Sequence, residues 1–230
     1  MQINTKAEPI NFKWNRKTHL EMTMLALKDC HLDKSTQRQI ARYSQMPDFC
    51  KEELGFHCNT HFYFPNSKNK SFGPNSDKNN ALEYFIEHVN HAIFGKKEND
   101  FLKYSGYAIH YLQDVAVPLH TEANNFIGKL LKYHLHKQFE RGERYGVNKH
   151  INEFVSDYKP KAIGIVSIVD LFKSMAEFSQ QPEFKVKNSN KDEWKTIQQA
   201  CFNRGVDATT ALFKKLSILR DFFNQGSSLN

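Results

Sequence analysis

The chain has 230 residues, which is enough for one large domain or two small ones with a sizeable core. Because 40% of the residues are hydrophobic and 13% are aromatic, the composition excludes a disordered tail. No stretch of about eighteen apolar residues occurs, so no transmembrane helix is predicted. The net charge of +7 would attract phosphate-bearing partners, but the basic residues are spread along the chain, which favours a diffuse field over a dedicated nucleic-acid patch.

Helical periodicity dominates the chain. An apolar stripe predicts a helix that Gly95 ends, and the next helix runs from residue 99 or 100 to about Val115, before Pro118. Candidate N-caps of the first of these helices are Asn75, Ser76 and Asp77. Helical patterns also fit residues 17–31, 34–44, 130–142, 146–157, 161–178 and 191–217. Strand-like alternation is scarce and no internal repeat or linker is evident, so the sequence predicts an all-α, single-domain helical bundle.

The segment from Gly106 to His120 carries the strongest functional signal. His110 and Asp114 are four residues apart, so a helix presents them on one face, and His120 follows Pro118. A second pair with the same spacing is His136 and Glu140. A single pair of this kind is common on a solvated surface. Two pairs and a further histidine within about thirty residues favour convergence on divalent metal ions.

Other candidate ligands have simpler interpretations. The four cysteines are Cys30, Cys50, Cys58 and Cys201. None forms a C-x-x-C motif, so a structural zinc knuckle is not predicted. Cys50 and Cys58 are close enough to form a disulfide, but isolated buried thiols fit equally well. His88 falls on an apolar helical stripe, which predicts a packed core imidazole.

Two upstream segments extend the pattern of candidate ligands. Trp14 and His19 form a W-x4-H motif, and Asp48 and His61 form D-x12-HFY. Followed by H-x3-D-x5-H and H-x3-E, these motifs resemble the bacterial zinc-dependent phospholipase C family and the related fungal zinc-dependent single-strand nucleases. The resemblance runs from Trp14 to about Leu216. It implies an all-α bundle built around a cluster of three zinc ions.

The resemblance also implies a role for each motif residue. The first zinc would be held by Asp48, His61, His110 and Asp114. The second would be held by His120, His136 and Glu140. Asp114 would bridge to a third zinc, which His19 and the backbone of Trp14 would also hold. Asp48 is in addition the candidate catalytic carboxylate, which would orient or deprotonate the attacking water.

The N-terminal region departs from the family pattern. In the family the tryptophan is the mature N-terminus, and its free amine and carbonyl chelate the third zinc. Here residues 1–13 precede Trp14, so its nitrogen is an amide without an available lone pair. We therefore expect residues 1–13 to be an N-terminal extension or pro-segment and residues 14–230 to be the catalytic domain. Either processing after Lys13 completes the third site, or that site binds its metal weakly.

The choice of substrate separates three hypotheses. A phospholipase C that hydrolyses the glycerol–phosphate ester bond is favoured by Glu140, because the nucleases resemble H-x3-D at that place. A nuclease is favoured by the positive charge and by the short gap between Trp14 and His19. A non-catalytic, metal-dependent binding module would explain the blocked tryptophan amine.

The aromatic residues of a headgroup site are only partly present. Phe49 and Phe62 stand where the phospholipases place aromatic rings for choline, and such rings hold a quaternary ammonium by cation–π contacts. Cys58 stands where a further ring is expected, so the sequence does not decide which headgroup is preferred. We expect a phospholipid substrate at a membrane surface, no stable nucleic-acid partner and a monomer. The resemblance implies a secreted or periplasmic protein, although residues 1–13 lack the apolar segment of a signal peptide.

Overall fold

The computed structural model describes residues 16–48, 61–68, 80–122, 135, 137–140, 146–147, 150–161, 163–164 and 167–227. Within these ranges the chain is helical and contains no strand, so the all-α prediction is confirmed. The helices are α1 (Arg16–Leu27), α2 (Lys34–Tyr43), α3 (Ala81–Phe94), α4 (Glu98–Asp114), α5 (Pro118–Thr121), α7 (Ile151–Asp157), α8 (Ile168–Ser179) and α9 (Trp194–Ser227). The short 3-10 helices are η1 (Met46–Asp48), η4 (Pro182–Phe184) and η5 (Asn188–Glu193).

Helices α3 and α4 follow the sequence prediction closely. Gly95 is the C-cap of α3, as expected. The N-cap is Asn80, not one of the three residues proposed upstream. Its side chain accepts hydrogen bonds from the backbone N–H groups of Leu82 and Glu83, which satisfies two donors that the helix start leaves open.

Four other helices have bounds that differ from the prediction, and one of them, α7, begins at Ile151 and not at residue 146. Helix α1 ends at Leu27, not at residue 31, because the N–H groups of Lys28 and Cys30 bond to carbonyls three residues back and tighten the chain into turns. Helix α8 begins only at Ile168, where the Ser167 hydroxyl accepts from the N–H of Asp170. Helix α9 runs to residue 227, ten residues beyond the predicted end.

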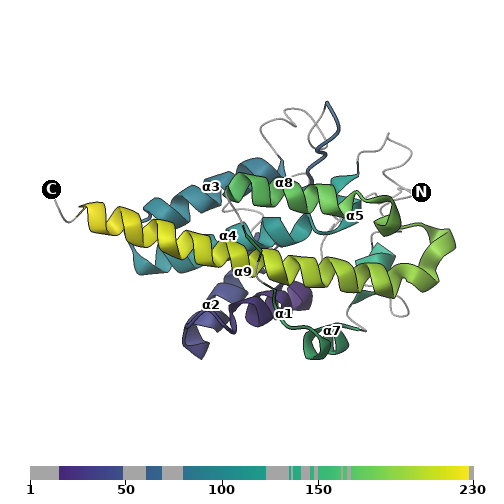
Figure 1. Cartoon of the computed structure of the whole chain (residues 1–230), viewed down its shortest axis with the longest axis horizontal. Helices are drawn as coiled ribbons and strands as arrows, with labels where there is room; N and C mark the ends of the chain where they lie inside the picture. Colours follow the sequence, from purple (N-terminus) through teal and green to yellow (C-terminus); the bar gives the residue numbers. More distant parts are fainter. Residues whose placement is uncertain are drawn as a thin grey trace, which may run out of the picture.

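Helix α4 is the central helix of the described fold. Every residue from Ser105 to Asp114 is buried, so this stretch has no solvated face. It packs against α2, α3 and α9, and α9 runs along the length of the molecule beside it (Figure 1). Polar side chains at the end of α4 are therefore held inside the protein.

Two apolar clusters make up the core. The larger one includes Phe85, Ile109 and Phe172, and the smaller one includes Phe154 and Trp194. The chain directly after Asp114 passes from one cluster to the other, because residues 115–116 belong to the first and residue 117 to the second. The end of α4 thus lies where the two clusters meet.

Of the cysteines that the structure describes, Cys201 is buried and Cys30 is half-buried. Cys30 and Cys201 are free cysteines, and Cys50 and Cys58 lie outside the described residues. None of the described helices combines the length and the apolar composition that a bilayer-spanning segment requires.

His88 is a core residue of α3, as predicted. Its side chain is 1% exposed, and its ring stacks on Tyr104 and Tyr111 and meets the edge of Tyr107. Neither ring nitrogen has a hydrogen-bond partner within the described part of the chain. Burial lowers the pKa of His88 to about 3, and the positive charges of His91, Lys103 and His110 act in the same direction. The ring is therefore neutral at physiological pH.

Replacing His88 by phenylalanine is expected to make the free energy of unfolding less dependent on pH below 6.5. The folded-state pKa of about 3 lies below the unfolded value of 6.5, so the contribution of His88 is complete above pH 6.5 and is lost as the pH falls. Relative to His88→Phe, the wild type should lose about 1.4 kcal/mol of unfolding free energy per pH unit, or roughly 3 kcal/mol by pH 4. Denaturant unfolding at several pH values, with chelator present, measures this difference.

The matched control is His91→Phe, which makes the same substitution at an exposed position of the same helix. Because this variant keeps His88, it should keep a loss of unfolding free energy on acidification that His88→Phe lacks. Parallel pH curves for the wild type and His88→Phe would contradict the prediction.

Candidate metal centre

The predicted ligands come together at the C-terminal end of α4. His110 lies one turn before Asp114, the last residue of that helix, and the two side chains are 0% and 1% exposed. The other described members are His19 on α1, Asp48 on η1, His61, His120 on α5, and Glu140; all are buried. Trp14, Phe49 and His136 lie outside the described residues.

The first predicted ligand group forms a tight triangle of donor atoms. Asp114 Oδ2 lies 2.6 Å from His61 Nδ1 and 3.2 Å from His110 Nε2. The two ring nitrogens are 3.0 Å apart. Ligand atoms of a tetrahedral zinc, at about 2.0–2.1 Å from the ion, lie roughly 3.3 Å from one another. The triangle can therefore close around one ion with small adjustments.

Asp48 completes this side of the cluster. Its Oδ1 atom lies 4.0 Å from His110 Nε2. One ligand atom each from His19, Asp48 and His110 also falls within 4.8 Å of the other two, a grouping that the sequence did not predict. Asp48 thus lies beside both the first and the third predicted ligand groups.

Asp114 also faces the other two groups through its second oxygen. Asp114 Oδ1 lies 3.4 Å from His19 Nε2, which brings together the described members of the third group. The same oxygen is 3.9 Å from His120 Nδ1. In the second group, His120 Nε2 lies 3.3 Å from Glu140 Oε1. One carboxylate therefore lies at the centre of all three described groups.

Three of the imidazoles are oriented by oxygen acceptors behind them. His19 Nδ1 lies 2.8 Å from Gln113 Oε1, and His110 Nδ1 lies 2.8 Å from the Ser44 carbonyl oxygen. His120 Nδ1 lies 3.1 Å from the carbonyl oxygen of His61. Because these oxygens only accept hydrogen bonds, each Nδ1 carries the proton, and each neutral ring keeps a lone pair on Nε2. Such outer contacts are typical of metal-binding imidazoles.

Sequence reasoning missed Gln113 and Ser44 as parts of this site. Ser44 acts through its backbone carbonyl, which any residue would provide. The one signal for Gln113 in the sequence was a polar residue directly before the candidate ligand Asp114.

Charges within the cluster keep Asp114 ionised. Burial alone would raise the pKa of Asp114, but His110 and His120 outweigh burial and hold it well below its usual value. Burial lowers the pKa of His19 and of His120, yet Asp114 reverses this and raises both overall. At His110 burial prevails, and the pKa is lowered. The centre is thus a buried anionic position that favours a cation.

The hydrogen bonding of two buried atoms in the cluster indicates whether its residues could bind a metal ion. His19 Nε2 and Asp114 Oδ1 are buried, and neither makes a hydrogen bond to the residues that the structure describes. A buried polar atom left in this way costs about 1–3 kcal/mol, and a cation bound to both would remove that cost. Imidazole nitrogen and carboxylate oxygen are also the donors that zinc accepts. The buried His and Asp groups could therefore hold a metal ion.

Phe62 lies against the cluster, not on the outer surface. Its side chain is 3% exposed, and its ring stacks on His120 with centroids 5.1 Å apart. This contact adds to the packing that holds the His120 ring. The role of Phe62 in headgroup binding stays a prediction.

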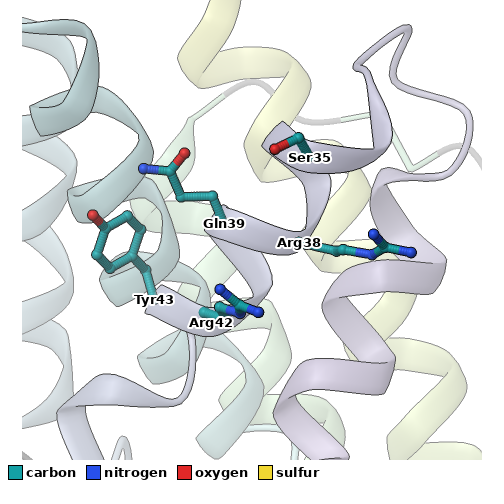
Figure 2. Close-up of a pocket in the computed structure, with 5 residues that line it drawn as sticks. All are labelled: Ser35, Arg38, Gln39, Arg42 and Tyr43. Carbon is teal, nitrogen blue, oxygen red and sulfur yellow. The ribbon is translucent and has the colours of Figure 1, made fainter.

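A pocket of about 480 Å³ on the outer face of α2 is separate from these ligands. It is lined by Ser35, Arg38, Gln39, Arg42 and Tyr43 (Figure 2). Gln39 Nε2 and Tyr43 Oη each donate to Asn99 Oδ1 at 3.0 Å, which ties α2 to α4. The pocket contains two arginines and none of the candidate ligands, so it is not part of the metal centre.

The fold of this chain matches solved structures of clostridial alpha-toxins. The chain matches the alpha-toxin of Clostridium perfringens isolated from an avian strain with a TM-score of 0.59 and 14% identity, over 92% of this chain and 65% of the toxin chain. It matches the alpha-toxin of Clostridium absonum with a TM-score of 0.61 and 14% identity, over 91% of this chain and 66% of that chain. The chain has the all-α fold of the clostridial alpha-toxins.

This similarity is limited both in sequence identity and in the length of the toxin chains that it covers. At 14% identity the alpha-toxin match shows the fold and not the activity. The chain spans about two thirds of the length of the toxin chains. No family model matches the chain, and a search of curated proteins gave no match. The function therefore has to be inferred from the chemistry of the metal centre.

Proposed function

We propose that the protein is a zinc-dependent phospholipase C that hydrolyses the glycerol–phosphate ester bond of phospholipids. The observation that carries this proposal is the position of Asp114. Its buried carboxylate lies within 4 Å of four imidazoles, those of His19, His61, His110 and His120. A purely structural role would not require so many ligand-type side chains around one buried anion.

The residues would divide among three zinc ions. Asp48, His61, His110 and Asp114 would hold the first, and His120, His136 and Glu140 the second. Asp114, His19 and the backbone of Trp14 would hold the third. Bound zinc supplies a water with a pKa near 7 and positive charge for phosphate oxygens.

Asp48 is the proposed catalytic residue of the chain. Its carboxylate is 3% exposed and lies on the same side of the cluster as His110. From there it would orient the attacking water and accept its proton, as a general base within the metal cluster. Asp48 would take the proton of the water as its oxygen bonds to phosphorus, and the glycerol oxygen would depart with the electron pair of the broken bond and take up a proton from solvent.

Support for a phospholipid substrate comes from several features together. The all-α fold implied by the phospholipase C resemblance is the fold shared with the alpha-toxins. Glu140, the phospholipase-type carboxylate, lies 3.3 Å from its predicted co-ligand His120. We further propose a secreted or periplasmic monomer that meets its substrate at a membrane surface. The headgroup sites Phe49 and Phe62 belong to this proposal.

A nuclease is the second candidate function. The net charge of +7 favours it, because phosphodiester backbones are attracted by basic surfaces. The two functions share the metal centre and differ in substrate, so a comparison of substrates separates them.

The test combines metal analysis with three substrates. Elemental analysis should find two or three zinc ions per chain. Para-nitrophenyl phosphorylcholine and mixed phospholipid vesicles should be hydrolysed, chelator should stop both reactions, and added zinc should restore them. Cleavage of single-stranded DNA with intact vesicles would replace the proposal by the nuclease. A folded protein that binds no zinc would overturn both.

A further inference from the structure

Gln113 lies directly before Asp114 on α4, and its side chain is fully buried. Its Oε1 atom lies 2.8 Å from His19 Nδ1. Its Nε2 atom donates to the hydroxyl oxygens of Thr23, at 3.1 Å, and Thr209, at 3.0 Å. One amide thus connects α1, α4 and α9 directly behind a candidate metal ligand.

A chain of hydrogen bonds fixes which way this amide points. The Ser44 hydroxyl donates to the carbonyl oxygen of Ala41 at 2.8 Å, so the Thr23 hydroxyl donates to Ser44 Oγ at 3.0 Å. Thr23 Oγ1 has then used its proton and must accept from Gln113. The amide nitrogen therefore faces the threonines, and Oε1 faces His19.

The amide orientation in turn fixes the tautomer of His19. Oε1 only accepts, so His19 carries its proton on Nδ1 and presents the lone pair of Nε2 to Asp114 Oδ1 at 3.4 Å. The carboxylate favours the opposite tautomer, because an Nε2–H group would hydrogen-bond to it. Gln113 opposes that preference and keeps Nε2 available to a metal ion.

We propose that Gln113 is a positioning residue that holds His19 in the metal-binding tautomer. This inference rests on the proposed metal centre. It predicts that Gln113 controls the affinity of the one metal position shared by His19 and Asp114. Loss of such an outer hydrogen bond typically weakens metal binding 10–100-fold.

The experiment compares two substitutions of Gln113. Gln113→Leu keeps a similar size but removes the acceptor, and Gln113→Glu keeps an acceptor for His19 Nδ1–H. In competition titrations with a zinc chelator, Gln113→Leu should bind its weakest zinc about 10–100-fold less tightly, and Gln113→Glu should recover most of the affinity. Gln37→Leu, at a buried glutamine of α2 remote from the ligands, should bind zinc as the wild type does.

A direct reading of the tautomer complements the titration. Nitrogen-15 NMR of the imidazoles in metal-free protein, at an alkaline pH where the His19 ring is neutral, should find Nδ1–H at His19 in the wild type and in Gln113→Glu. In Gln113→Leu the signal should shift towards Nε2–H. A merely structural role for Gln113 would not change this spectrum.

The zinc affinity and the His19 tautomer of the variants together decide whether Gln113 positions His19. Unchanged zinc affinity and an unchanged His19 tautomer in a folded Gln113→Leu protein would overturn it. If Gln113→Leu does not fold, Thr209→Val removes one anchor of the amide without touching His19 and should give a smaller loss of the same kind. If the wild type binds no zinc, the proposed function fails, and the NMR measurement still decides whether Gln113 sets the tautomer.

Discussion

Replacing Asp114 by asparagine is expected to remove most of the bound metal and to lower phosphodiester hydrolysis about a thousandfold or more. Asparagine keeps the size of the side chain but removes the charge that His19, His61, His110 and His120 surround. It also presents an amide N–H₂ where a metal requires a lone pair. Elemental analysis and initial rates on para-nitrophenyl phosphorylcholine measure the two effects.

Asp207→Asn is the matched control for this experiment. Asp207 is another largely buried carboxylate, which accepts hydrogen bonds from the Tyr158 hydroxyl and the Lys161 N–H at 2.6 Å each. Its substitution should destabilise the fold and leave the zinc content unchanged. An Asp114→Asn protein with the full zinc content and the wild-type rate would refute the assignment of this centre.

The elements that the sequence predicted well are those with local signals. The apolar stripe of α3 and its terminal Gly95 define that helix without tertiary information. The spacing of His110 and Asp114 places both on one face, and the structure brings their ligand atoms to 3.2 Å. Pro118 ends the helical pattern and starts α5, which carries His120 into the same cluster.

The remaining ligands required more than local pattern. Asp48 and His61 are separated by a stretch outside the described residues, and no helical or strand period relates them. Only the family resemblance placed them with His110, and the structure finds them beside it. Gln113 and Ser44 act through hydrogen bonds between distant segments, so their roles depend on packing that a single sequence does not reveal.

The same dependence on packing explains the end of α1. Residues 28–31 fit the helical period, but the chain turns there to bring α2 against α4. That contact matters for the site, because Ser44, the C-cap of α2, provides the carbonyl that orients His110. The position of α2 on α4 is thus coupled to the geometry of the metal centre.

Gly106 is where this coupling can be tested. It lies on α4 against α2, and a methyl group added there would overlap with Tyr43 Cβ and lie 2.8 Å from the Ile40 carbonyl oxygen. Because these are atoms of the α2 backbone and its first side-chain carbon, the whole helix must shift. Gly106→Ala should therefore lose about 3 kcal/mol of unfolding free energy. It should also weaken zinc binding, because Ser44 moves away from His110.

Gly205→Ala separates this effect from the general cost of adding a methyl group to a buried helical glycine. A methyl group at Gly205 would approach Met22 Sδ at 2.9 Å, and a thioether can move aside. The gain in helix propensity, about 1 kcal/mol, should offset that adjustment and leave stability and zinc affinity near the wild type. Denaturant unfolding and chelator competition compare the two variants. Equal zinc affinity in Gly106→Ala and Gly205→Ala would mean that the carbonyl of Ser44 does not set the position of His110.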